Sequence, residues 1–236
     1  MKKKAIILLL AITSANICVY GQSRTGTFSI IPKIGTNISN ATGNELFTDN
    51  SVLKPKSKAG LAFGVDVQYQ ISKALAMSLG IGYSRQGYRY ADYQSTVTTT
   101  DDYTEYEGFS DHHHNIDYLT MPLTLHCYVE PNLAIGVGIQ TAFIIDSKYI
   151  YETSTFKEYE NGMREYTTNT LRHEVECTSA VLKKADFSIP LSVSYEYMNV
   201  VVAATYNIGL TNFNKSPLPK SKNKVISFTA GYRFSL

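Results

Sequence analysis

Four charged residues stand on the small, polar faces of strand-like segments: Lys33, Asp66, Glu196 and Arg233. In each segment, apolar residues alternate with polar or small ones, so successive side chains point to opposite faces of a strand. Two cations and two anions shut away from water must be paired and hydrogen-bonded. The sequence therefore predicts a structural ion-pair network of these four residues, and a proton or ion path through them is the less favoured alternative.

Three consecutive histidines, His112, His113 and His114, suggest metal chemistry, with Asp111 and Asp117 beside them. Adjacent side chains on an extended chain point to opposite faces, so one ion cannot easily take all three rings. Metal sites use spaced ligands that a second shell of residues orients. We therefore predict a solvated, pH-sensitive loop here, with no metal and no other cofactor.

Signatures of the common catalytic sites are absent from the chain, including Gly-x-Ser-x-Gly, His-Glu-x-x-His, the P-loop and the dinucleotide fingerprint. His126 is the only histidine on an expected strand, and no Ser and Asp or Glu set accompanies it. We predict no catalytic residues and no enzyme activity. A lipid-modifying enzyme with a Ser/His pair at the rim of a barrel stays as an alternative.

The elements that carry these residues are eight segments, each at least as long as the roughly 9–11 residues of a tilted membrane-spanning strand. Their apolar faces alternate with faces of Gly, Ala, Ser and Gln, and the last apolar face continues to the C-terminal Leu236. This pattern is typical of strands with lipid outside and a packed polar lumen inside. The segments are 26–37, 58–71, 74–89, 116–129, 132–145, 186–198, 200–211 and 224–236.

Connections between these segments alternate between tight turns and long polar stretches. The long stretches are 38–57, 90–115, 146–185 and 212–223. Short turns on one side and long loops on the other are the outer-membrane pattern, with both termini in the periplasm. The predicted fold is all-β, a monomeric eight-stranded antiparallel up-and-down transmembrane β-barrel of the outer-membrane type.

The first residues read as an export signal. Three lysines precede the apolar run 5–12, and a cleavage site follows before Gln22. We predict a cleaved signal peptide at 1–21 and the barrel domain at 22–236, with lipoprotein processing at Cys18 as an alternative. Cleavage removes three of the 22 basic residues and none of the 20 acidic ones, so the net charge changes from +2 to −1. Binding of nucleic acid needs a basic patch, and nothing in the sequence suggests one, so we predict no nucleic-acid partner.

The stretch 146–185 carries five aromatic residues among mixed charges: Tyr149, Tyr151, Phe156, Tyr159 and Tyr166. Aromatic loops on a rigid scaffold form binding surfaces. The equally weighted alternative is a membrane-interface girdle with a hairpin that extends the barrel.

Prolines and cysteines give further expectations. Pro32, Pro122 and Pro190 lie within strand patterns, and proline cannot donate to a ladder, so we expect a bulge or an early strand end at each. Cys127 and Cys177 are expected at opposite ends of the barrel, too far apart for a disulfide, and both are predicted to be free thiols.

Four motifs in order along the chain resemble the PorT-like outer-membrane β-barrel proteins of the Bacteroidetes. They are IPKIGTNIS at 31–39, YSRQG at 83–87, YLTMPL at 118–123 and YNIGLTN at 206–212. The resemblance covers most of the chain and implies a fold and an outer-membrane location. It implies no catalytic residues, and the link of the founding member to secretion and gliding does not carry over on fold alone.

These observations predict a structural or binding role, exerted through the long external loops or by contact with other envelope proteins, with outer-membrane lipids as surroundings. A secreted lipocalin-like binder is the main alternative, since it is also an eight-stranded barrel. In that case the apolar faces point inward around a ligand.

Overall fold

The computed structural model describes residues 25–49, 51–177, 182–215 and 221–236. The predicted signal peptide at 1–21 lies outside the described residues. Among the described residues, no helix is both long and apolar enough to cross a membrane.

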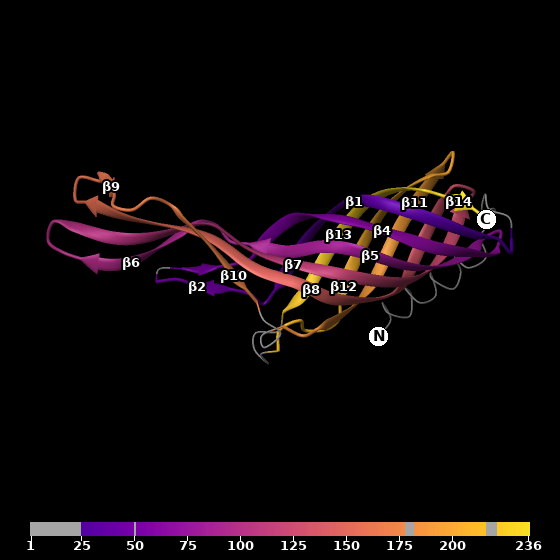
Figure 1. The fold of residues 1–236 in the computed structure, drawn as a ribbon, viewed down its shortest axis with the longest axis horizontal. Helices are drawn as coiled ribbons and strands as arrows, with labels where there is room; N and C mark the ends of the chain where they lie inside the picture. The colour runs from indigo at the N-terminus through magenta and orange to yellow at the C-terminus, as the bar shows by residue number, and fades with distance from the viewer. Residues whose placement is uncertain (1–24, 50, 178–181, 216–220) are drawn as a thin grey trace, which may run out of the picture.

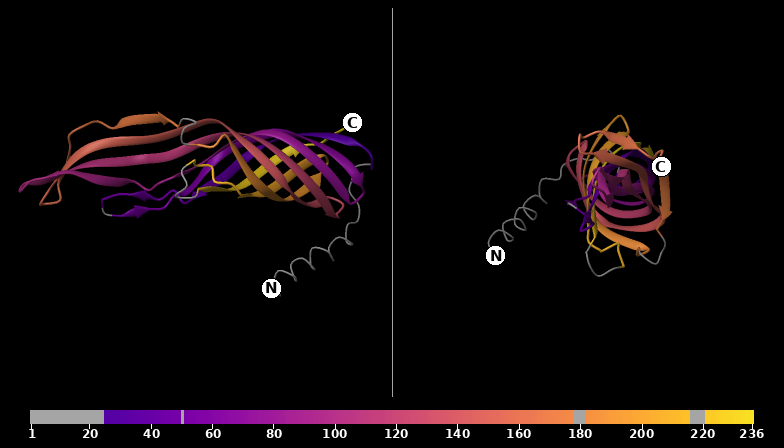
Figure 2. Two further views of the ribbon diagram at one scale, coloured as in Figure 1. Left: turned by 90° about the horizontal axis from the view of Figure 1, so that it is seen from below. Right: turned by 90° about the vertical axis from the view of Figure 1, so that its left-hand side faces the viewer.

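Eight antiparallel strands form a closed ring, because the β7–β8 pairing joins the two ends of the sheet (Figures 1 and 2). This confirms the predicted eight-stranded barrel. The ring strands are β1 (Phe28–Thr42), β4 (Lys56–Ser72), β5 (Leu75–Arg89), β7 (Tyr103–Glu130), β8 (Leu133–Tyr159), β11 (Ala185–Tyr197), β12 (Val200–Gly209) and β13 (Lys222–Tyr232).

Apolar side chains cover the outside of the ring. Ile139 is 65% exposed, and Leu79 and Phe228 are about half exposed. The alternate residues point inward, where Gly, Ser, Thr and Gln pack. Exposed apolar faces of this extent are stable only when lipid covers them. In a lipocalin the apolar faces point into the barrel, around the ligand. The lipocalin alternative is therefore wrong.

Two barrel strands run far beyond the barrel and form a sheet that projects from one end (Figure 1). This sheet, the outer extension, consists of residues 90–115 and 146–177. Here β7 and β8 pair with β6 (Tyr93–Thr99), β9 (Arg164–Tyr166) and β10 (Leu171–Glu176). The prediction of loops across these stretches is wrong for most of their length. Outside the membrane, neither face of a strand must be apolar. The strands of the outer extension therefore lack the alternation of apolar and polar residues that made the barrel strands predictable.

Smaller elements complete the fold, and β2 and β3 form a separate two-stranded sheet. β14 (Phe234–Ser235) continues β13 along the first residues of β1. The hairpin of β2 (Leu46–Phe47) and β3 (Val52–Leu53) projects beside the outer extension (Figure 2).

The three strand prolines do not cause bulges. At each of Pro32, Pro122 and Pro190, the ladder to one neighbour skips two residue pairs and resumes in the same register. The ladder to the other neighbour continues. A strand residue directs its N–H to one neighbour only, so a missing N–H weakens one ladder and leaves the other intact. The expected bulges are wrong, and a strand end occurs only opposite Pro32, where β13 gives way to β14.

The cysteines behave differently from each other. Cys177 is a free thiol, as predicted. Cys127 is disulfide-bonded, so the prediction of a free thiol there is wrong.

Candidate functional site

The inner end of the lumen, near the short turns, is filled by a buried polar network. Arg233 Nε donates to both carboxylate oxygens of Glu196, at 3.0 and 2.9 Å. Arg233 Nη2 donates to the Tyr128 hydroxyl at 3.3 Å, and Gln68 donates to the same hydroxyl at 2.9 Å. All four side chains are buried. The sequence placed Glu196 and Arg233 in the lumen, and the structure pairs them directly. Tyr128, which sequence reasoning missed, links Arg233 to Gln68.

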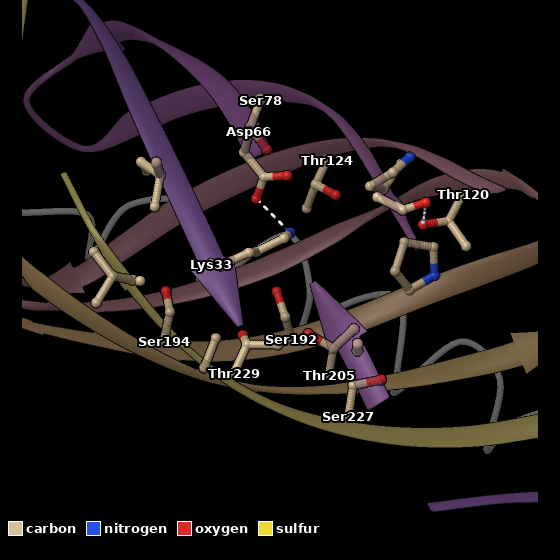
Figure 3. Close-up of a pocket in the computed structure, with 18 of the residues that line it drawn as sticks. Lys33, Asp66, Ser78, Thr120, Thr124, Ser192, Ser194, Thr205, Ser227 and Thr229 are labelled. Carbon is tan, nitrogen blue, oxygen red and sulfur yellow. Dashed lines mark hydrogen bonds and ion pairs between the residues drawn. The ribbon is translucent and has the colours of Figure 1, made fainter. Parts of the chain in front are cut away.

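The second pair of lumen charges lies further along the barrel. Lys33 Nζ on β1 donates to Asp66 Oδ2 on β4 at 2.5 Å (Figure 3). Gly80 on β5 makes room for this carboxylate, because a Cβ there would lie 2.2 Å from Asp66 Oδ1. The structure therefore brings the four predicted residues together as two separate pairs.

A chamber of about 140 Å³ lies between the pairs and the outer end of the barrel. Asp66 Oδ1 and Arg233 Nη1 are buried and lack a hydrogen-bond partner among the described residues. A polar cavity of this size has room for ordered water molecules, which can bond to such buried polar atoms. The hydroxyl side chains that line the chamber include Ser78, Thr120, Thr124, Ser192, Ser194, Thr205, Ser227 and Thr229 (Figure 3).

A serine and a histidine meet in this chamber. Ser78 Oγ and His126 Nε2 are 2.8 Å apart, on the neighbouring strands β5 and β7. Register alone brings them together, because Ser78 stands opposite Thr124, two residues before His126. Sequence reasoning found no serine partner for His126, because it compared motifs and not cross-strand neighbours. Asp66, the nearest candidate acid, is already paired with Lys33.

The outer end of the lumen is filled by apolar and aromatic side chains. Tyr118 and Phe213 are fully buried, and they pack with Ala41, Tyr88, Ile116, Ala142 and Leu182. Asn223 donates to the Tyr118 hydroxyl and to Asp186 Oδ2, both at 2.8 Å. Side chains thus fill both ends of the chamber.

Rings continue from this outer cluster along one face of the outer extension. His114 stacks on Tyr149 with ring centroids 4.0 Å apart, and Tyr151 stacks on His173 at 4.9 Å. His112 lies between them, 5.5 Å from Tyr151. We call this face the ring ladder; its nine members are Tyr88, Tyr90, Tyr93, Phe109, His112, His114, Tyr149, Tyr151 and His173.

The five aromatic residues predicted as a loop surface do not lie together. Tyr149 and Tyr151 belong to the ring ladder. Phe156 is buried on the opposite face and packs on Tyr166, which is 65% exposed. Tyr159 stands near the tip, opposite Tyr103. The hairpin that extends the barrel, which was one of the two alternatives, is present.

The three histidines separate as their alternation predicts. His114 is buried and bonds to Ser147 Oγ at 2.7 Å, and burial lowers its pKa to about 3. Burial, and then the neighbouring His113, also lower the pKa of His112. His113 turns to the other face and bonds to Asp111. Within the described ranges, no three His, Cys, Asp or Glu side chains are grouped so that they could hold a metal ion.

Comparisons with solved structures find several small outer-membrane proteins. Ail, the attachment invasion locus protein of Yersinia pestis, is 10% identical with a TM-score of 0.39, over 89% of this chain and 100% of its own. Neisserial surface protein A is 10% identical with a TM-score of 0.38, over 88% and 97%. CarO2 of Acinetobacter baumannii is 10% identical with a TM-score of 0.37, over 88% and 99%.

No curated protein matches the chain in sequence. A family model described as the outer membrane protein beta-barrel domain matches residues 20–215. This match spans most of the sequence and agrees with the closed ring and its apolar exterior. The chain is therefore a small outer-membrane protein, and it belongs to the outer membrane protein beta-barrel domain family.

Proposed function

We propose that this protein is a non-catalytic outer-membrane barrel whose filled lumen does not conduct and whose outer extension is a binding surface. The single observation that carries the proposal is the contrast between the two parts. The lumen is filled at both ends by buried side chains, whereas the ring ladder presents half-buried rings beyond the membrane. A scaffold with a closed interior and an aromatic outer sheet is suited to recognition at its outer end.

The proposal includes orientation, export and assembly. A cleaved signal peptide at 1–21 exports the chain, both termini lie in the periplasm, and the outer extension faces the exterior. The strand count and the short turns near the termini support this orientation. The barrel acts as a monomer without a cofactor, and other envelope proteins are its expected partners. The four ordered motifs support a PorT-like protein from the Bacteroidetes.

Two measurements test this proposal. The full chain in a planar lipid bilayer should show no steady conductance, and a stable open channel would contradict the filled lumen. Protease added to intact cells should cut at exposed residues of 160–170 without releasing the barrel. Protection of that segment in intact cells, with cleavage only after the outer membrane is opened, would reverse the orientation.

A lipid-modifying enzyme is the second candidate, favoured by the Ser78–His126 contact at 2.8 Å. It requires lipid to enter the lumen. Hydrolysis of phosphatidylcholine by the reconstituted wild type, abolished in Ser78→Ala and His126→Ala, would support it. No hydrolysis by the wild type would remove it.

A further inference from the structure

Six cations lie just beyond the apolar belt, where four neighbouring strands leave the membrane. We call them the basic arc: Lys56, Lys58, Arg85, Arg89, Lys222 and Lys224. They stand on β4, β5 and β13, and β1, which carries none of them, lies between β13 and β4. The register sets their levels, with Lys56 opposite Arg89, and Lys224 opposite Asn40 of β1. Strand spacing makes the arc about 15 Å wide.

Five residues of the basic arc are on the lipid-facing side of the barrel, whereas Lys58 is half-buried on the same face of β4 as the lumen residue Asp66. Arg85 lies on the same face of β5 as Leu79 and Ile81, and Lys224 lies on the same face of β13 as Ile226. Every cation of the arc except Lys58 is exposed. The charges therefore stand at the depth of lipid headgroups.

Few acids neutralise this charge. Asp117 takes two bonds from Arg85, at 2.8 and 2.9 Å, yet the Arg85 side chain stays 45% exposed. Lys58 bonds to the neutral amide of Asn115. No described carboxylate lies within 4.0 Å of the charged groups of the other four cations.

Charge is divided between the two parts of the molecule. Thirteen of the 20 acidic residues lie in the outer extension, at 90–115 and 146–177, with only four of the 22 basic residues. An anionic membrane surface therefore repels the outer extension and attracts the basic arc.

We propose that the basic arc binds the phosphate groups of an anionic lipid in the outer leaflet. Guanidinium groups match phosphate oxygens as two-pronged donors, and the lysines add point charges. The inference rests on the proposed orientation, in which the outer extension and the arc face the exterior. It goes beyond that proposal, because it identifies the class of lipid that contacts the outer rim of the barrel.

The test measures lipid retained by the purified full chain in neutral detergent, by native mass spectrometry. The probes are diphosphoryl lipid A and the same lipid after enzymatic removal of its phosphates. The variants Lys56→Gln/Arg89→Gln and Lys222→Gln/Lys224→Gln each remove two unpaired cations. The matched control, Lys157→Gln/Arg164→Gln, removes two cations from the distal extension.

We expect each arc variant to bind the phosphorylated lipid about 30-fold more weakly, because it loses the attraction of two charges to an anionic surface. The control should bind like the wild type. The dephosphorylated lipid should bind weakly to every form, added salt should weaken wild-type binding, and inorganic phosphate should not compete.

Equal binding of the two lipids by the wild type would overturn the inference, even if a variant failed to fold. So would equal losses in the arc variants and the control. Faster migration of unboiled protein on SDS gels verifies the folded barrel in each form. Protease accessibility of 160–170 tests the orientation separately, so failure of the lipid inference is distinguishable from failure of the proposed function.

Discussion

Arg233 meets Glu196 inside the barrel, with Nε 2.9 and 3.0 Å from the two carboxylate oxygens and both side chains less than 10% exposed. Glu196 lies on β11 and Arg233 lies between β13 and β14, so the pair reaches across the intervening strand β12. Burial strips water from both charges, so each depends on the other for compensation.

Arg233→Met should leave Glu196 buried and unpaired, and we expect the free energy of unfolding to fall by about 3–5 kcal/mol. Urea unfolding in detergent micelles measures this loss. The double variant Glu196→Met/Arg233→Met should recover most of it, because neither charge remains. A double variant as unstable as the single one would show that the pair itself stabilises the barrel.

Gly80→Ala should disturb the other lumen pair, because the new Cβ would lie 2.2 Å from Asp66 Oδ1. We expect a loss of about 1–3 kcal/mol in the free energy of unfolding, which is typical of overpacking. Adding Asp66→Ala removes the clash, so the effects of the two substitutions should not add. Additive losses would mean that Gly80 serves some need other than space for the carboxylate.

The barrel was predictable because the membrane imposes one rule on every spanning strand. Leu79 and Ile139 face lipid, so their alternation with Gly and Ser is strict and visible in the sequence. The outer extension lies outside the membrane, so its strands need no apolar outward face. Its strands pair Tyr106 with Phe156 on one face and Tyr103 with Tyr159 on the other, so its faces do not differ in polarity.

The lumen was predictable in composition but not in pairing. Alternation placed Lys33, Asp66, Glu196 and Arg233 inside, whereas their partners depend on stagger between strands. Ser78 and His126 meet because of the β5–β7 register, which tight turns and bulges set and which no single strand encodes. Tyr128 lies two residues after His126 and therefore shares its inward face, so alternation alone could have added it to the predicted network.

Acid should loosen the ring ladder. Burial lowers the pKa of His114 to about 3, below the ordinary 6.5. As the pH falls, His114 in the unfolded chain therefore takes up a proton before the buried His114 of the folded chain does. The stability that neutral His114 contributes above pH 6.5 is lost as the pH falls from 6.5 toward 3. The slope for this group reaches at most about 1.4 kcal/mol per pH unit.

Amide hydrogen exchange at residues 112–114 and 147–151, corrected for intrinsic rates, measures this loosening. Protection should decline between pH 7 and pH 5. His173→Gln is the matched control, because it removes a ring from the open edge strand β10 and should leave the decline in place. Constant protection across that range would contradict the prediction.

A charge on the outside of the barrel should cost stability in proportion to its depth in the membrane. Ile139 lies midway along the apolar face of β8, which runs from Leu133 to Ile145. Ile139→Lys should lower the free energy of unfolding in phospholipid vesicles by about 2–4 kcal/mol, because the ammonium is far from both interfaces. Ile145→Lys places the same charge at the outer boundary, beside Asp146, and should cost at most about 1 kcal/mol. Equal effects of the two variants would contradict lipid contact along this face, since only a membrane distinguishes two exposed isoleucines on one strand by depth.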